Sequence, residues 1–387
     1  MTATAGAEAT SAARAPSPSP SSPSILSPVV DFLCVGGLSL IVLVPLLVSG
    51  QAELGFVTIA ALVWIQTLIN TAHFMASYRI VYRDREMIMK HKWAAIGVPV
   101  IMAAFIALAL ATESTVLVVL FFAVSSGYLA WHYTGQAWGM MASYGRLGGL
   151  SFDKSERLLI RSSLRIMLAW HVTWFLHYAI RNPAVLEPVD AIYRVVSAVT
   201  IIGFALGLVG LVKAWRRTGR IPPVRAVVPW LAIFVWYAAV ARWGIAGLFL
   251  VQLAHAIQYL EFPARVEVNR ASANKAVRLG THMLLYAAAL LALAFAVTVV
   301  VPGPAMSVVT DALGIAQGSA APVLILYFIN IHHYFTDGVI WKISNPEVRR
   351  DLFAHVMTAE APSGARGKQT AQAPKPKAGK PRQGAKR

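Results

Sequence analysis

Long apolar segments recur along this sequence, and they constrain its fold more than any other feature. One occupies residues 35–48 and another residues 281–302. A helix rises about 1.5 Å per residue, so about 20 residues cross a hydrocarbon core about 30 Å thick. Transmembrane strands would instead appear as short segments in which apolar and polar residues alternate. The apolar segments therefore predict membrane-spanning helices.

The composition agrees with this prediction. Hydrophobic residues make up 57% of the chain and charged residues only 13%, and the mean hydropathy is +0.61. A soluble domain of average composition has about 25% charged residues on which to build a wetted surface. The predicted fold class is therefore all-α, a polytopic bundle of about ten transmembrane helices. We expect these helices near residues 29–49, 55–77, 94–112, 115–143, 164–181, 192–213, 226–242, 244–263, 280–301 and 321–341.

The chain divides into one membrane domain and two polar ends. Residues 1–24 are rich in Ala, Ser, Pro and Thr, so we expect a disordered N-terminal segment. Residues 25–357 form the predicted integral membrane domain. Residues 358–387 contain eight Lys or Arg residues and form a predicted disordered basic tail.

The basic residues fall almost entirely on one side of this layout. When alternate loops are assigned to the same side, the side with both termini contains 31 of the 34 Lys and Arg residues. Basic residues that flank membrane spans remain in the cytoplasm. The sequence therefore predicts a multi-pass protein of the cell inner (cytoplasmic) membrane with both termini in the cytoplasm. The same asymmetry explains the net charge of +17 without a nucleic-acid partner, and we expect the basic tail to contact anionic membrane lipids.

Histidines are the most informative polar residues, because seven of the ten fall within predicted spans. Four of them precede the first basic residue at the cytoplasmic end of their helix by six to fourteen residues, which is roughly 9 to 21 Å. His171 lies near the same depth on a helix that runs the other way. Ionisable groups inside a membrane are costly and usually functional. A shared depth on separate helices predicts a common site formed by His73, His132, His255 and His333.

A polar residue follows each of these four histidines by four positions and therefore lies on the same helix face. These partners are Ser77, Gln136, Tyr259 and Asp337. Asn70 and Asn330 precede His73 and His333 by three positions. A metal-bound imidazole usually donates its second N–H to such an oxygen acceptor. We therefore expect supporting roles beside the ligands for Asn70, Gln136, Asn330, Ser77 and Tyr259.

Clustered neutral imidazoles suit iron, copper or zinc, and carboxylates nearby favour iron. The single cysteine, Cys34, rules out a cysteine cluster. We expect a transition-metal centre, with iron preferred, in which Asp337 and Glu261 contribute to the chemistry. The predicted metal ligands are His73, His132, His255, His333, His332 and His171.

The predicted function is that of a metal-dependent membrane oxidoreductase of oxygenase or desaturase type that acts on a lipid or isoprenoid-type apolar substrate. An electron-donor protein would bind on the cytoplasmic side. The chain resembles polytopic enzymes that hold a metal with histidines from several helices, but it lacks the His-x-x-x-His and His-x-x-His-His boxes of membrane desaturases. Two alternatives remain open: a proton-coupled transporter whose histidines relay protons, and an electron-transfer protein that holds haem between two histidines.

Overall fold

A computed structural model describes residues 23–50, 53, 55–180, 182–273, 278–305, 321–341, 348 and 352–353. The predicted N-terminal segment before residue 23 and the basic tail lie outside the described residues. Within the described part the chain is helical and contains no strand, so the all-α prediction is confirmed. The elements, in order, are α1 (Pro28–Phe32), η1 (Leu33–Gly37), α2 (Leu38–Val48), α3 (Phe56–Val81), α4 (Arg85–Lys90), η2 (Trp93–Gly97), α5 (Val98–Ala111), α6 (Thr115–Leu147), α7 (Lys154–Ala179), α8 (Pro183–Thr218), α9 (Val224–Trp243), α10 (Ile245–Ala273), α11 (Leu279–Phe295), η3 (Ala296–Ala305) and α13 (Ala321–Ile340).

Eight helical segments among the described residues are long and apolar enough to cross a membrane. The other two predicted spans, α7 and α13, are also helical. Helix α7 contains several charged residues, and α13 contains two histidines and one aspartate. Many large apolar side chains point outward, among them Ile201 at 75% exposure and Leu284 at 70%. Soluble proteins rarely expose so much apolar surface, whereas a bilayer requires it. The chain is therefore a multi-pass membrane protein.

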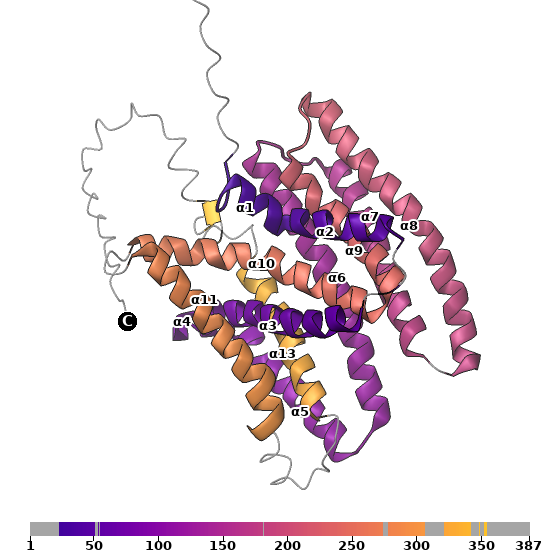
Figure 1. Cartoon of the computed structure of the whole chain (residues 1–387), viewed down its shortest axis with the longest axis vertical. Helices are drawn as coiled ribbons and strands as arrows, with labels where there is room; N and C mark the ends of the chain where they lie inside the picture. Colours follow the sequence, from indigo (N-terminus) through magenta and orange to yellow (C-terminus); the bar gives the residue numbers. More distant parts are fainter. Residues whose placement is uncertain are drawn as a thin grey trace, which may run out of the picture.

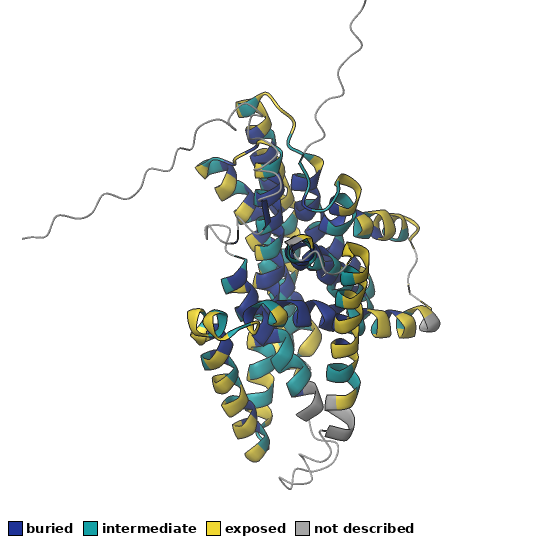
Figure 2. Ribbon diagram, turned by 90° about the vertical axis from the view of Figure 1, so that its left-hand side faces the viewer, coloured by how far each residue is buried: buried dark blue, intermediate teal, exposed yellow. Residues whose placement is uncertain are grey.

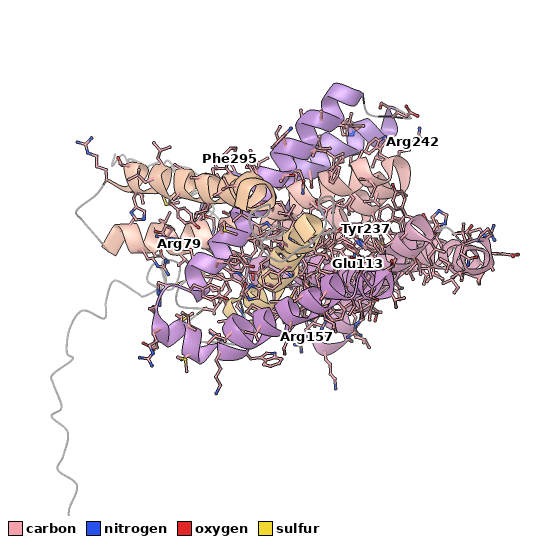
Figure 3. All side chains as sticks on the ribbon, turned by 90° about the horizontal axis from the view of Figure 1, so that it is seen from below. Arg79, Glu113, Arg157, Tyr237, Arg242 and Phe295 are labelled. Atoms are coloured by element: carbon pink, nitrogen blue, oxygen red, sulfur yellow. The ribbon has the colours of Figure 1, made fainter. Side chains whose placement is uncertain are left out.

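The helices form one bundle with its buried residues in the middle. Figure 1 shows α3, α10 and α13 crossing near the centre, while α8 forms the right-hand edge. Figure 2 shows that the buried residues gather in the interior and that the exposed ones lie on the outer helices. The largest hydrophobic core lies among α6, α7, α9 and α10 and includes Trp236 and Tyr237. Figure 3, in which Tyr237 is labelled, shows the side chains that fill this interior.

Three of the predicted helices are longer than expected, and one of them, α10, continues ten residues past its predicted end to Ala273. Helix α7 begins at Lys154, ten residues before the predicted start, because Asp153 and Glu156 form a reciprocal capping box. The backbone N–H of Glu156 also lowers the pKa of the Asp153 carboxyl. Helix α8 extends to Pro183–Thr218. The apolar pattern missed these extensions because charged turns outside an apolar run carry no hydropathy signal.

Small residues allow close packing at two places. Gly36 has a φ of 128°, which only glycine adopts readily, and a Cβ there would lie 2.8 Å from the Cβ of Ala232 on α9. A Cβ on Gly207 of α8 would lie 2.4 Å from Nε1 of Trp230, also on α9. The absence of side chains at these positions lets the backbones approach each other.

Ion pairs join helix ends that the charge pattern assigns to the same side. Arg79, labelled in Figure 3, pairs with Glu267 at 2.8 Å, and Arg217 pairs with Glu156 at 2.7 Å. On the opposite predicted side, Arg242 donates to the backbone carbonyl of Gly50 at 2.8 Å. The structure thus groups the helix ends as the alternating layout requires.

Candidate metal centre

Four histidines from four different helices meet in the centre of the bundle. They are His73 of α3, His132 of α6, His255 of α10 and His333 of α13, and their exposures are 0%, 7%, 1% and 0%. The four imidazole rings lie in a circle in which each ring contacts the next. Centroids are 4.7 Å apart for His73 and His333, 5.5 Å for His333 and His132, 5.0 Å for His132 and His255, and 5.3 Å for His255 and His73.

The closest approach in this cluster joins two ring nitrogens. Nε2 of His73 and Nε2 of His333 lie 3.1 Å apart. The backbone carbonyls of Asn70 and Asn330, three residues earlier, lie toward these rings, although neither Nδ1 makes a hydrogen bond of good geometry. With Nδ1 protonated and turned to the carbonyl, both Nε2 atoms would present lone pairs to each other. Two nitrogens bound to one metal at about 2.1 Å lie about 3.0 to 3.4 Å apart, which matches this separation.

Asp337 adds one carboxylate to the cluster. Its Oδ1 accepts hydrogen bonds from Ser77 at 2.6 Å and from Tyr259 at 2.9 Å. Its Oδ2 has no hydrogen-bond partner and lies 3.8 Å from Nε2 of His132. Among the described residues, His132 is the only basic group within ion-pair distance of this buried carboxylate. A cation between Oδ2 and the imidazoles would compensate the charge.

Ligand atoms of two overlapping groups lie close enough to hold a metal ion. One group is His73, His255 and His333, and the other is His132, His333 and Asp337. In each group the candidate ligand atoms lie within 4.8 Å of one another. Both ring nitrogens of His255 and Nε2 of His132 are buried without a hydrogen-bond partner. Buried polar atoms are nearly always paired, so a concentration of unpaired ones at a single point is typical of a site that binds a ligand.

A layer of hydroxyl groups supports the cluster from one helical turn away. Ser77 and Tyr259, each four residues after a cluster histidine, have hydroxyls 2.6 Å apart and both contact Asp337. The indole of Trp341 donates to the Tyr259 hydroxyl at 2.7 Å. Trp341 follows Asp337 by four positions, so the sequence pattern that identified the other partners extends to it as well. This layer fixes Oδ1 and leaves Oδ2 facing the imidazoles.

Gln136 is the fourth residue at this spacing, but it has a different set of contacts. Its amide donates to Oε1 of Gln258 at 3.0 Å, and it lies 3.5 Å from the backbone carbonyl of His255. Gln258 in turn donates to the carbonyl of Val35 at 2.7 Å. Gln136 therefore joins α6 to α10 and not to the carboxylate layer.

Three other residues of the predicted site lie outside both ligand groups. His332 faces away, with Nδ1 2.9 Å from the Tyr78 hydroxyl and Nε2 2.9 Å from the carbonyl of Ala94. His171 lies on the far side of Tyr133 from the cluster. The ring centroid of Tyr133 is 6.2 Å from that of His171 and 4.3 Å from that of His255. Glu261 is hydrogen-bonded to Tyr144. Adjacent residues on a helix point about 100° apart, so His333 faces the cluster while His332 contacts Tyr78 and Ala94.

A cavity of about 300 Å³ borders the carboxylate side of the cluster. His132 and Asp337 form part of its wall, together with Tyr259 and Trp341 of the supporting layer. The sequence patterns did not identify this cavity, because its walls come from four helices. A small molecule in it would lie directly beside the group of His132, His333 and Asp337.

Comparison with known proteins identifies no relative. No family model matches the chain, and no curated protein and no solved structure matches it either. The class that the fold and the cluster define is therefore a multi-pass helical membrane protein with a buried four-histidine and aspartate cluster.

Proposed function

We propose that this chain is a membrane metalloprotein in which His73, His132, His255, His333 and Asp337 bind a transition metal, with iron preferred over copper and zinc. The observation that carries the proposal is the convergence of unpaired imidazole nitrogens and one unpaired carboxylate oxygen on a single buried point. Two histidines and one carboxylate are the ligand set of non-haem iron enzymes that leave coordination positions open for oxygen and substrate.

We infer further that the protein is an oxidoreductase of oxygenase or desaturase type, acting on an apolar substrate. The group with the carboxylate borders a cavity lined mainly by aromatic and glycine residues, where such a substrate would fit. Dioxygen would serve as the oxidant, and a donor protein on the cytoplasmic side would supply two electrons. The charge asymmetry supports the inner membrane as the location, with both termini in the cytoplasm.

Metal content provides the direct test. The full chain, purified without chelators, is expected to contain stoichiometric metal by elemental analysis. Alanine at any one of His73, His132, His255 or His333 should lower the content at least about tenfold, because a primary ligand is lost. His177→Ala is the matched control, since His177 pairs with Asp190 at 2.5 Å, away from the cluster. Wild-type protein without metal, or cluster variants that retain it, would contradict the proposal.

The two other functions predict different results. A haem protein would show a Soret band. A bis-histidine haem needs its two ligands on opposite faces of a flat macrocycle. Nε2 of His73 lies only 3.1 Å from Nε2 of His333, so this pair leaves no room for the macrocycle between them. A proton relay would need no metal, and the direct contact between these two nitrogens is the observation in its favour. Metal-free wild-type protein that acidifies vesicles in a His73-dependent manner would support the relay.

A further inference from the structure

The cavity beside the cluster has walls of an unusual kind. Its lining includes three indoles, Trp131, Trp138 and Trp341, and three further aromatic rings, Tyr259, Phe262 and Tyr334. Large flat side chains of this kind bind apolar chains and rings through area and not through directed bonds. The cavity can therefore receive a long apolar group of varied structure.

Glycines give this cavity its depth. Gly135 and Gly139 of α6 and Gly338 of α13 all line it, and a Cβ added to any of them would meet no atom within 4 Å. Several other glycines of this bundle allow close helix contacts, as Gly207 does. At these three positions the missing side chains leave open space next to His132 and Asp337 instead.

One fixed positive charge lies on the cavity wall. Arg161 of α7 lines the cavity and also a neighbouring one of about 100 Å³, which Arg165 and Thr134 line too. Five other arginines of the described residues, among them Arg79, Arg217 and Arg225, have carboxylate partners at 2.7 to 3.3 Å. Arg161 has no ion-pair partner in the described part of the chain. A guanidinium without a carboxylate beside an aromatic cavity is suited to an oxyanion headgroup.

We propose that this cavity binds an amphiphile with one apolar chain or ring system and an oxyanion headgroup, either a carboxylate or a phosphate, which Arg161 receives. The apolar part would lie against the indoles and reach the side of the cluster formed by His132 and Asp337. This proposal rests on the proposed function, because it names the substrate class of the same site.

A simpler role for Arg161 is to contact the phosphates of surrounding lipids, as basic residues at membrane surfaces do. The two roles differ in one respect. Lipid contact would neither saturate with a single ligand nor depend on the open space at Gly135. Binding in the cavity requires both Arg161 and that space.

The test uses quenching of tryptophan fluorescence in the full chain, reconstituted in discs of zwitterionic phosphatidylcholine. The probes are a dodecanoate with a terminal bromine, the corresponding dodecyl phosphate, the methyl ester and the trimethylammonium compound. Gly135→Leu fills the cavity, and Gly127→Leu is its control, because Gly127 is also on α6 with open space around it but does not line the cavity. Arg161→Gln removes the charge, and Arg157→Gln, one turn earlier on α7 and labelled in Figure 3, is its control.

We expect saturable quenching by at least one of the two oxyanion probes, and which one saturates identifies the headgroup. The dissociation constant should rise about tenfold or more for the methyl ester and for Arg161→Gln, since a charged hydrogen bond is lost. Gly135→Leu should abolish saturation, and both controls should behave as wild type. Equal binding of the methyl ester or the ammonium probe, or wild-type binding by Gly135→Leu and Arg161→Gln, would overturn the proposal.

Elemental analysis of the same samples separates this proposal from the metal proposal. Gly135→Leu and Arg161→Gln should retain metal, because neither residue belongs to the ligand groups. Saturable oxyanion binding in protein without metal would leave the cavity assignment standing and remove the proposed function. Full metal content without saturable binding would do the reverse.

Discussion

At the scale of single residues, the cluster brings together several buried polar atoms that have no hydrogen-bond partner in the described part of the chain. An unpaired buried polar group costs about 1–3 kcal/mol, and a buried carboxylate costs more. His73, His132, His255 and His333 could each be replaced by apolar residues if only packing mattered. A bound metal would recover the cost by satisfying the nitrogens and the charge together.

Asp337→Asn should separate the two contributions of this carboxylate. The amide has nearly the same volume but no charge, so we expect metal affinity to fall about tenfold or more. The metal-free protein should become no less stable, because an uncompensated buried charge has been removed. Metal titration and thermal unfolding in detergent measure both effects. Asp190→Asn is the control, and an equal loss of metal in that variant would show that the effect is not specific to the cluster.

Trp341→Phe tests the supporting layer. The substitution removes the hydrogen bond to the Tyr259 hydroxyl, which is 2.7 Å long in the structure. Loss of such a supporting partner typically lowers metal affinity about 10–100-fold without removing a ligand. Competition with a chelator of known affinity gives the change. Trp215→Phe, at an exposed position of α8, should leave the affinity unchanged. Identical affinities for Trp341→Phe and wild type would remove Trp341 from the site.

At the scale of helices, the site depends on shared direction as well as shared depth. The charge pattern predicts that α3, α6, α10 and α13 all run from the outside to the cytoplasm, so a residue four positions after each histidine lies one turn deeper on every helix. This explains why Ser77, Tyr259 and Asp337 meet in one layer. A helix in the opposite direction would place its partner residue on the other side of the imidazoles.

Helix packing around the site depends on small residues, and Gly207→Leu tests this. The new side chain would collide with the indole of Trp230, which donates to Ser163 of α7 at 2.9 Å. Overpacking costs about 1–3 kcal/mol, so we expect the melting temperature in detergent to fall by roughly 2 to 6 °C. Gly280→Leu on α11, where a Cβ meets nothing within 4 Å, should leave it unchanged. Equal melting temperatures for both variants would place the α8 and α9 interface elsewhere.

At the scale of the whole molecule, the ion pairs among helix ends agree with the alternating layout. Arg217 and Glu156 join the ends of α7 and α8, and Arg79 and Glu267 join those of α3 and α10. The positive-inside pattern of the sequence predicts that these paired ends lie on the cytoplasmic side.

Cysteine labelling tests this orientation. In a Cys34→Ser background, Ser151→Cys and Ile221→Cys should react with a membrane-impermeant maleimide only after the cytoplasmic side is exposed. Val185→Cys should react from the outside of intact cells. All three positions are exposed in the structure, so access does not limit the reaction. Labelling of Ser151→Cys and Val185→Cys from the same side would contradict the ten-span layout.

The amino-acid sequence by itself determined the helices, because the length of an apolar segment is a local property that must match the thickness of the bilayer core. All ten predicted segments are helical in the structure. The sequence also determined which residues share a face, since the spacing of four between His73 and Ser77, or between His333 and Asp337, fixes their relative direction on any α-helix. The predicted cluster of His73, His132, His255 and His333 follows from their shared depth and from the polar residue four positions after each of them, and the structure brings these four together.

Only the tertiary structure decided how each helix is rotated about its own axis. The sequence left His332 among the predicted metal ligands beside His333, and packing turned His332 toward Tyr78 and Ala94. It placed His171 across Tyr133 from His255, although both lie at a similar depth. The cavity at Gly135 and Arg161 also depends on packing, because its walls come from separate helices. The rotation of each helix is set by side-chain contacts between segments far apart in the chain, and a local sequence pattern cannot predict those contacts.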